Sequence, residues 1–384
     1  MSRFSRVYFH CVEELNAYQD DVVVLADGLQ QLGVEVTGNC HYWRRSTAPD
    51  DWLVRPGAGP ADCDIVVISS AWSRWIDDRF KVYERPLPDW LFAPGRRYRT
   101  AYVDYDDGYA TSTWRPEYRA FDAIFRAKYN RRCFHPANQH PWALGLNTRM
   151  LECTAGAPPW SARRRELLVN FGASHPYVHG ARALAGPPFT AAARPHFALD
   201  DRRDDLSVAP ADPYDRLMWE QTQRRHSRDY YGRLKAAQAI VAFCGELIPP
   251  APFYPQYLVG GRRARLSRAW FELLARFDPR PPRLIQWDSW RFWEGLAAGC
   301  LVFNLDLPLY GVDLPVMPRS MEHYVAVRPD NAPDVLARLM SEPGLAERIA
   351  AQGRAWALEH YSPRALARRF LDTMARTPAQ SPSP

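Results

Sequence analysis

The chain has 384 residues, 47% of them hydrophobic and 24% charged, with a formal net charge of +6. This length predicts two or three domains, and the composition excludes a collagen-like chain or one that is disordered as a whole. The small positive excess favours anionic partners without requiring a nucleic acid.

Short strands alternate with helices in the first part of the chain. We expect a helix over residues 20–32, where apolar residues recur at a helical repeat and Gly33 follows as a left-handed stop. Strands are expected at residues 6–10, 34–37, 64–69, 100–103 and 123–125. The strand at 64–69 holds a continuous β-branched run, which is typical of a strand covered on both faces. This alternation predicts an open parallel sheet.

A connector rich in Pro and Arg, residues 155–165, predicts a boundary after which the same pattern restarts. Further strands are expected at 166–171, 239–243, 301–304 and 323–328, and further helices at 290–298, 334–340, 344–359 and 363–375. Residues 186–213, rich in Pro, Asp and Arg, predict a long surface loop or lid, and residues 377–384 predict a disordered tail. The predicted fold class is therefore α/β, with two doubly wound domains facing one another.

Residues 288–300 carry the strongest functional pattern in the sequence. Ser289 can cap a helix by accepting a backbone N–H, and Gly299 can end that helix in the left-handed conformation. Gly295 leaves a smooth face with which the helix can press closely on a sheet. A helix N-terminus at the edge of a sheet is a binding site for a diphosphate, because its first N–H groups are unpaired and its dipole favours negative charge.

Side chains of this helix would supply most of the affinity for such a ligand. Each charge-assisted hydrogen bond contributes about 1.5–3 kcal/mol, and the dipole about 0.3–1 kcal/mol. Arg291 can bind phosphate oxygens, and Glu294, one turn after Trp290 on the same face, can accept from two adjacent hydroxyls of a ribose. The alternative is a capped amphipathic helix whose Arg291 and Glu294 face solvent.

Two other strand ends are expected beside this helix, because ligands of doubly wound sheets bind outside the carboxyl ends of the strands. The strand at 166–171 ends on Gly172, which lets the backbone approach a ligand closely. Arg182 is a candidate phosphate partner, with an ordinary surface arginine as the alternative. Glu246 follows the strand at 239–243 on the same side.

Several common types of site find no support in the sequence. The seven cysteines are scattered without a C-x-x-C pair, which indicates a reducing compartment and no disulfide framework. Prolines interrupt the pairs His135–His140 and His175–His179, so no zinc site is expected. Walker and dinucleotide-binding glycine motifs are missing. Because the sequence contains neither an apolar run of membrane-spanning length nor a signal-peptide core, we expect a cytoplasmic protein.

The run S-x-R-F-x-E-x-L-A-A-G-C at residues 289–300, followed by an apolar strand, resembles the C-terminal domain of GT-B glycosyltransferases. The similarity is greatest to the branch related to exostosins and spore-maturation glycosyltransferases, and it extends from Tyr230 to the end of the chain. The resemblance implies that Glu294 binds the donor ribose. It also implies that Ser289 and Arg291 face the diphosphate.

The same resemblance implies two Rossmann-like domains facing across a cleft. Residues 1–155 would form the acceptor-side domain and residues 166–361 the nucleotide-sugar domain. A helix at 362–376 would cross back onto the N-terminal domain, before the tail at 377–384. In this fold a helix dipole and arginine replace a metal ion at the diphosphate, so we expect no metal or other cofactor besides the nucleotide-sugar co-substrate.

GT-B geometry also places the loops after certain N-terminal strands at the acceptor cleft, where an acid can serve as general base. Asp104, Asp106 and Asp107 follow the strand at 100–103 and could each serve. Glu13 and Glu14 follow the strand at 6–10 and are rivals on the same ground. Of these, Asp106, Asp107 and Glu13 are the candidate catalytic carboxylates.

Asp104 and Asp106 form a D-x-D, which holds a metal-bound nucleotide in GT-A glycosyltransferases. The alternative is an acidic turn closed by Gly108. Trp114 and Trp142 lie in segments that read as loops and are candidate acceptor contacts, although most tryptophans are expected in the core or at its rim.

The leading hypothesis is a metal-independent glycosyltransferase. It would transfer a sugar from a nucleotide-diphosphate sugar to a hydroxyl of a small molecule or glycan, which suits bacterial carbohydrate biosynthesis and the GC-rich coding bias of the sequence. One rival is a metal-dependent transferase built on Asp104 and Asp106. The other is a non-catalytic protein that binds a nucleotide sugar or nucleic acid, and a DNA-modifying glycosyltransferase is a variant of both ideas.

Overall fold

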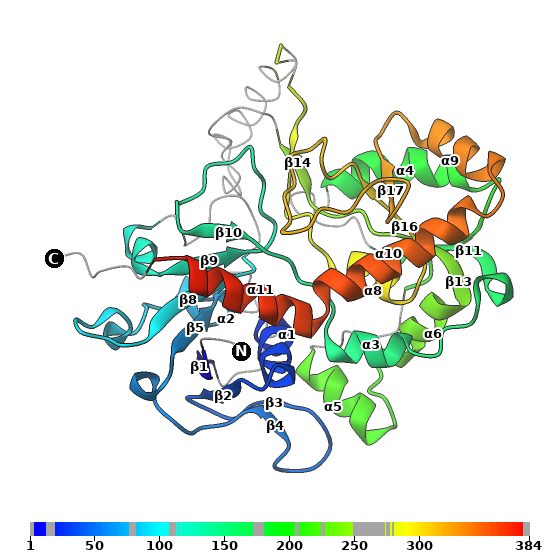
Figure 1. The fold of residues 1–384 in the computed structure, drawn as a ribbon. Helices are drawn as coiled ribbons and strands as arrows, with labels where there is room; N and C mark the ends of the chain where they lie inside the picture. Colours follow the sequence, from blue (N-terminus) through cyan, green and yellow to red (C-terminus); the bar gives the residue numbers. More distant parts are fainter. Residues whose placement is uncertain are drawn as a thin grey trace.

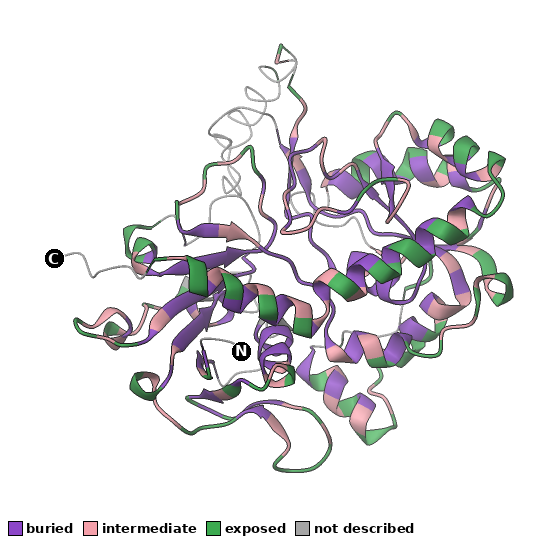
Figure 2. Ribbon diagram, in the orientation of Figure 1, coloured by how far each residue is buried: buried purple, intermediate pink, exposed green. Residues whose placement is uncertain are grey.

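The computed structural model describes residues 4–12, 20–76, 82–106, 113, 115–171, 180–203, 207–222, 224, 227–248, 273, 277–278 and 280–378. They form two parallel sheets with helices around each, and the last helix returns from the second sheet to the first (Figure 1). Most strand residues of the two sheets are buried, whereas the long C-terminal helices are exposed along one side (Figure 2). The fold is α/β with two doubly wound units, which confirms the predicted fold class.

The first sheet has six strands in the order β10-β9-β8-β5-β1-β2, and every neighbouring pair is parallel. Its strands are β1 (Arg6–His10), β2 (Glu35–Gly38), β5 (Ile65–Ser69), β8 (Arg99–Asp104), β9 (Ala123–Arg126) and β10 (Gln139–Pro141). Helix α1 (Asp20–Gln31) connects β1 to β2. All of β5 is buried, as its continuous β-branched run predicts. Strand β10 was not predicted, because its Gln-His-Pro sequence has no strand character.

The second sheet has five parallel strands in the order β12-β11-β13-β16-β17. Its strands are β11 (Arg164–Leu168), β12 (Ala198–Asp200), β13 (Ala237–Val241), β16 (Leu301–Leu305) and β17 (Val325–Val327). Its helices are α4 (Gly180–Ala193), α5 (Pro213–Gln221), α6 (Arg228–Ala236), α8 (Trp290–Ala297), α9 (Ala332–Ser341) and α10 (Leu345–Tyr361).

Smaller elements lie outside the two main sheets. Three antiparallel pairs are β3 (Tyr42–Arg44) with β4 (Trp52–Val54), β6 (Arg74–Ile76) with β7 (Val82–Glu84), and β14 (Glu246–Ile248) with β15 (Arg283–Ile285). Two short helices are α2 (Ser70–Ser73), directly after β5, and α3 (Thr148–Thr154), which leads into the segment joining the two sheets.

Helix α4 and strand β12 occupy part of residues 186–213, so the loop or lid predicted there is wrong. Its composition is misleading because Pro187 and Pro188 lie inside α4, where an internal proline removes a backbone hydrogen bond and costs about 3 kcal/mol. Packing offsets this cost, since every fourth residue from Ala181 to Ala193 is fully buried on one face of the helix.

Helix α8 lies directly against the second sheet. A Cβ atom on Gly295 would stand 2.6 Å from Ile240 Cγ2 and 2.9 Å from Val302 Cγ2, one residue on β13 and one on β16. The smooth face predicted for this helix is therefore confirmed. Gly299 follows the helix with a φ of +69°, which confirms the predicted left-handed ending.

The last helix, α11 (Pro363–Arg376), packs against α1 of the first unit. A Cβ on Gly28 of α1 would lie 1.9 Å from the backbone oxygen of Pro363. Phe370 packs on Phe125 of β9 with ring centroids 4.8 Å apart. The C-terminal helix thus crosses back to the first sheet, as predicted (Figure 1). The domain boundaries at 155, 166 and 361 stay predictions.

Candidate active site

Helix α8 begins beside the carboxyl ends of the second sheet, with Ser289 as its N-cap residue. Its backbone is extended, as a cap requires, but its side chain accepts no hydrogen bond from the N–H groups of the first turn, so the predicted capping bond is wrong. The side chain is buried, and its Oγ has no hydrogen-bond partner in the part of the chain that the structure describes. Such a hydroxyl costs about 1–3 kcal/mol, and a polar ligand at the helix start would relieve that cost.

Two arginines near this helix start are anchored to the ends of different strands. Arg291, in the first turn of α8, donates from Nε to the carbonyl of Asn170, just beyond β11, over 2.5 Å. Arg182, on α4, donates from Nε to the carbonyl of Phe243, just beyond β13, over 2.7 Å. Each side chain is therefore fixed at the carboxyl end of a central strand, where ligands of parallel sheets bind.

Arg182 is not the surface arginine that the sequence left as an alternative. Its side chain is only 5% exposed, and its guanidinium lies 5.2 Å from the centroid of the Phe171 ring. Burial lowers the pKa of Arg182, the Cys244 thiol opposes that effect, and the positive charge of Arg291 lowers the pKa further. Two cations that destabilise each other in a buried place would be stabilised by an anion between them.

Glu294, one turn into α8, is 4% exposed and is held on both carboxylate oxygens. Tyr230 donates its hydroxyl to one oxygen over 2.9 Å, and Tyr231 donates to the other over 3.2 Å. Burial raises the pKa of both tyrosines well above their ordinary value, and the charge of Glu294 adds to it, so both hydroxyls stay protonated. The alternative in which Glu294 faces solvent is wrong. The two tyrosines were not predicted, because only their Ser227-capped helix has a local signal.

The other predicted donor-site residues lie around the same strand ends. Glu246 is buried at the start of β14, where its Cγ would lie 3.5 Å from a Cβ added at Gly180, the first residue of α4. Trp290 is half-buried and packs against the core of the second unit. Gly172 lies outside the described residues.

Asp288 joins the helix start to the first unit, a role that the sequence did not suggest. One carboxylate oxygen accepts the backbone N–H of Leu144, beyond β10, over 2.7 Å, and the other accepts from Trp293 Nε1 over 2.6 Å. Burial raises the pKa of Asp288 to about 6, while these two hydrogen bonds and the charge of Lys128 oppose the rise. Asp288 therefore fixes α8 relative to the opposite sheet.

The two aspartates of the predicted D-x-D lie in different environments. Asp104, at the end of β8, is fully buried and pairs with Arg126 on β9 over 2.7 Å, so it does not have the open carboxylate that a metal-bound nucleotide needs. Asp106 is 8% exposed, and its backbone N–H donates to Asp104 over 3.0 Å, whereas Gly108, which would close the predicted acidic turn, lies outside the described residues. Glu13 and Asp107 lie outside the described residues.

Within the described ranges, no three His, Cys, Asp or Glu side chains are grouped so that they could hold a metal ion. His135 instead bonds Gln139 Oε1 and the carbonyl of Asn130, each over 2.8 Å. His175 and His179 lie outside the described residues.

His10 was not predicted as a candidate site residue, although it directly follows the apolar residues Val7–Phe9 at the end of a predicted strand. Its ring lies at the carboxyl end of β1, 4.1 Å from the Trp72 ring centroid and 5.3 Å from that of Trp90. Burial lowers the pKa of His10 to about 4, and the nearby charge of Arg85 contributes to the shift. The ring is therefore neutral at pH 7. Its Nδ1 is buried and has no hydrogen-bond partner among the residues described.

A cavity of about 250 Å³ lies next to this aromatic corner, lined among others by Ser73, Arg85 and Tyr118. Arg85 also lies over the Trp72 ring at 4.5 Å, so cationic and aromatic surfaces adjoin there. The predicted acceptor contact at Trp142 is wrong, because that side chain is 2% exposed and packs in the core against Phe125. Trp114 lies outside the described residues.

Comparison with known proteins rests on structure alone. No family model matches the sequence, and no curated protein matches it. An α-glucosyltransferase solved with UDP and a 13-mer DNA containing a central A:G mismatch superposes with a TM-score of 0.55 at 9% identity, covering 97% of this chain and 100% of that one. The α-glucosyltransferase AGT with UDP gives 0.54 at 8% identity, over 97% and 100% of the two chains.

A glycosyltransferase from Rickettsia africae ESF-5 covers 98% of this chain and 99% of its own, with a TM-score of 0.48 at 10% identity. At such identities the similarity shows the fold alone: the chain has the two-domain GT-B glycosyltransferase fold. The narrower resemblance to exostosins and spore-maturation glycosyltransferases stays a prediction. No helix among the described residues is long and apolar enough to span a membrane.

Proposed function

We propose that this protein is a metal-independent glycosyltransferase that uses a nucleotide-diphosphate sugar as donor and a hydroxyl-bearing small molecule or glycan as acceptor. One observation carries the proposal. Arg182 and Arg291 are anchored at the carboxyl ends of the neighbouring strands β13 and β11, and Arg291 lies at the start of α8 with the unpartnered hydroxyl of Ser289.

The diphosphate would bind between these groups. Both arginines have their Nε atoms fixed by backbone carbonyls, which orients the rest of each guanidinium before the ligand arrives. Charge-assisted hydrogen bonds to phosphate contribute about 1.5–3 kcal/mol each, so two guanidinium groups would outweigh the dipole of a short helix. The same groups would stabilise the charge that develops on the leaving diphosphate, because they are positioned before reaction starts. This arrangement takes the place of a metal ion in the proposal.

Glu294 would bind the ribose of the donor. A carboxylate has about four acceptor positions, and the hydrogen bonds from Tyr230 and Tyr231 orient this one. A ribose presents two adjacent hydroxyls that match a single fixed carboxylate. Glu246 and Trp290 lie around the same strand ends and would complete the nucleotide side of the site.

The acceptor would lie at the carboxyl edge of the first sheet. The corner formed by His10, Trp72 and Arg85 combines aromatic rings with a cation next to the cavity of about 250 Å³, which suits the ring of a sugar or another cyclic hydroxyl compound. Asp106, Asp107 and Glu13 remain the proposed general bases for the acceptor hydroxyl. DNA is the alternative acceptor, since a protein of this fold was solved with DNA.

Donor hydrolysis with and without EDTA tests the proposal. The purified protein is incubated with a panel of nucleotide-diphosphate sugars, and release of the nucleoside diphosphate is followed. We expect slow hydrolysis of at least one donor, unchanged by EDTA and reduced about tenfold or more by Arg291→Met. Arg368→Met, an exposed arginine on α11, is the matched control and leaves the rate unchanged.

Three results distinguish the alternatives. Activity that is lost in EDTA and restored by a divalent cation would support a metal-dependent transferase. Tight donor binding without hydrolysis or transfer would support a binding protein. Faster turnover with duplex DNA than with sugars or small alcohols would make DNA the acceptor.

A further inference from the structure

The loop that follows β9 at the carboxyl edge of the first sheet, residues 127–132 (the β9 loop), contacts the second unit through Asn130. The side chain of Asn130 is 1% exposed. Its Nδ2 donates to two carbonyls of the second unit, that of Leu284 on β15 and that of Tyr310 beyond β16, each over 2.9 Å. One buried amide therefore joins two loops of the second unit to the edge of the first sheet.

Neighbouring contacts fix Asn130 in this place. Its Oδ1 accepts the backbone N–H of Arg132 over 3.0 Å, so Nδ2 is the amide atom that faces the two carbonyls. Gly311 leaves room for it, because its φ is +80° and a Cβ there would stand 2.6 Å from Asn130 Oδ1. Arg131 donates its backbone N–H to the carbonyl of Gly311 over 2.9 Å, and Asp313 donates to a carbonyl of the β9 loop over 3.1 Å. The two segments thus pair as an antiparallel bridge.

The β9 loop is also bonded to the loop after β8, which carries the candidate base Asp106. The backbone N–H of Ala127 donates to the carbonyl of Asp104 over 2.9 Å, and Lys128 Nζ donates to the carbonyl of Tyr105 over 3.2 Å. Lys128 has a φ of +61°, a conformation unfavourable for a residue with a Cβ, which surrounding contacts must stabilise. Hydrogen bonds therefore connect the loop of the candidate base, through the β9 loop, to the second unit.

On the second unit the same bonds end close to the proposed donor site. Leu284 lies five positions before Ser289, the N-cap residue of α8. Arg291 and Arg182 are each bonded to a carbonyl of the second unit itself, so they are held without help from the first unit. Asn130 therefore acts on where the edge of the first sheet lies and not on the groups assigned to the diphosphate.

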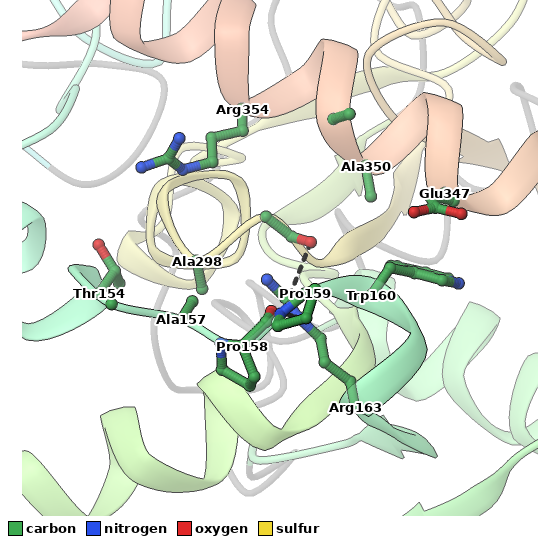
Figure 3. Close-up of a pocket in the computed structure, with 13 residues that line it drawn as sticks. Thr154, Ala157, Pro158, Pro159, Trp160, Arg163, Ala298, Glu347, Ala350 and Arg354 are labelled. Atoms are coloured by element: carbon green, nitrogen blue, oxygen red, sulfur yellow. Dashed lines mark hydrogen bonds between the residues drawn. The ribbon is translucent and has the colours of Figure 1, made fainter.

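The segment that joins the two sheets, residues 155–163, is held on the second unit. Arg163 donates from Nη1 to the carbonyl of Gly299 over 2.8 Å, beside a cavity of about 390 Å³ (Figure 3). Lys235 and Gln238 donate to two other carbonyls of the segment, each over 3.3 Å. Since this connection belongs to the second unit, the position of the first sheet depends on contacts such as that of the β9 loop.

We propose that Asn130 is a positioning residue, which holds the carboxyl edge of the first sheet against the donor site in one arrangement. This inference rests on the proposed function, and it concerns the step that needs both units. In that step the bond from the anomeric carbon to the diphosphate breaks, a bond to the acceptor oxygen forms, and a base of the first unit takes the hydroxyl proton. The base must lie within hydrogen-bond reach of that hydroxyl, so loss of the bonds of Asn130 lowers the rate of transfer without weakening the binding of the nucleoside diphosphate.

Alanine variants of two asparagines test the proposal. Asn138 is the matched control, because it is also buried and its Nδ2 also donates to two carbonyls, those of Tyr118 and Phe121, but within the first unit. We expect Asn130→Ala to lower kcat about tenfold or more, while the calorimetric Kd for the nucleoside diphosphate changes less than about threefold. Asn138→Ala should leave both quantities unchanged, with a similar loss of stability to urea.

Amide hydrogen exchange tests the same contact without any substrate. Arg131 and Asp313 each donate a backbone N–H from one unit to the other. Asn130→Ala should speed exchange at both amides about tenfold or more, because these bonds then open without unfolding of either unit. Asn138→Ala should leave both exchange rates unchanged.

A second variant reaches the same amide from the opposite unit. Gly311→Ala places a methyl group against Asn130 Oδ1. Gly95→Ala is its control, because Gly95 has a φ of +77° and a Cβ there meets no atom of the described residues within 4 Å, so it has similar backbone strain without the contact. We expect Gly311→Ala to reproduce both effects of Asn130→Ala, and Gly95→Ala to show neither.

Equal kcat in Asn130→Ala and Asn138→Ala would overturn the proposal, and so would exchange at Arg131 and Asp313 that stays as slow in Asn130→Ala as in the wild type. A wild-type protein that neither binds a nucleoside diphosphate nor releases one from a donor would refute the proposed function instead. The exchange rates would then still decide whether Asn130 holds the two units together.

Discussion

At the scale of single residues, Glu294 is the side chain whose surroundings say most about its role. Its two carboxylate oxygens accept hydrogen bonds from Tyr230 and Tyr231, which are 64 and 63 positions away in the sequence. Removing this carboxylate costs stability, because substitution by Ala would take away an acceptor that both buried hydroxyls use, at about 1–3 kcal/mol for each hydrogen bond lost. Glu294→Gln is therefore a cleaner test of function than Glu294→Ala.

We predict that Glu294→Gln raises the donor KM about tenfold with a smaller change in kcat, because ribose binding is made in both the ground state and the transition state. Tyr231→Phe removes one hydrogen bond but keeps the charge, so its effect on KM should be smaller. Steady-state kinetics with circular dichroism measures both. A lower melting temperature with an unchanged donor KM would show that Glu294 is only structural.

Asp288 carries a prediction about pH. Burial raises its pKa in the folded protein to about 6, above the value of about 3.9 in an unfolded chain. The unfolded state therefore gives up this proton at lower pH than the folded state. The stability associated with Asp288 is fully present below about pH 4 and is lost as the pH rises to about 6, by roughly 2–3 kcal/mol.

Asp288→Asn removes this titration, so the difference in free energy of unfolding between wild type and variant should become less favourable to wild type by roughly 2–3 kcal/mol between pH 4 and pH 7. Urea unfolding at a series of pH values measures it. The variant also disturbs the hydrogen bond from Trp293. This changes the free energy of unfolding by the same amount at every pH, so it does not alter the pH dependence of the difference. A difference that stays constant across this range would contradict the assignment.

At the scale of elements, helix α8 is placed by close contact with the sheet. Gly295→Ala would force a methyl group to within 3 Å of Ile240 and Val302, so we predict a loss of stability of about 1–3 kcal/mol. Gly186→Ala in α4 is the matched control: a Cβ there meets no atom within 4 Å, and the substitution should be neutral or stabilising. Chemical denaturation of both variants checks this, and equal effects would refute the packing argument.

Elements with a strong local pattern could be predicted from the sequence, while elements that depend on distant contacts could not. The β-branched run of β5 and the glycine after α8 needed only neighbouring residues. Helix α4 could not be predicted from its local sequence, because Pro187 and Pro188 disfavour a helix. Burial of its side chains against the sheet outweighs the cost of the two prolines. Strand β10 is defined by pairing with β9 and has no pattern of its own.

In the candidate site, too, local sequence patterns could be predicted and contacts between distant residues could not. The pattern at residues 288–300 predicts α8 as a ligand-binding helix, with Arg291 and Glu294 as its candidate residues. The surroundings that give those residues their properties come from far along the chain: Arg291 meets Asn170, which is 121 positions away. The bond between Asp288 and Leu144 joins positions 144 apart, and no sequence period records it.

At the scale of the whole molecule, contacts between the two units hold the two sheets together. Helix α11 returns to α1, and Asn130 donates from Nδ2 to the carbonyls of Leu284 and Tyr310, each over 2.9 Å. Asp288 adds a bond at the start of α8. The start of the proposed donor-binding helix is thus fixed by contacts from both units, which is what a preorganised site requires.

Binding of a nucleoside diphosphate, compared with the nucleoside alone, tests the central claim most directly. Calorimetry with a panel of nucleoside diphosphates should find at least one that binds much more tightly than its nucleoside, and Arg291→Met should weaken that diphosphate about 10- to 100-fold without affecting the nucleoside. If no nucleoside diphosphate binds, or if Arg291→Met binds it as tightly as the wild type, then the start of α8 is not a diphosphate site.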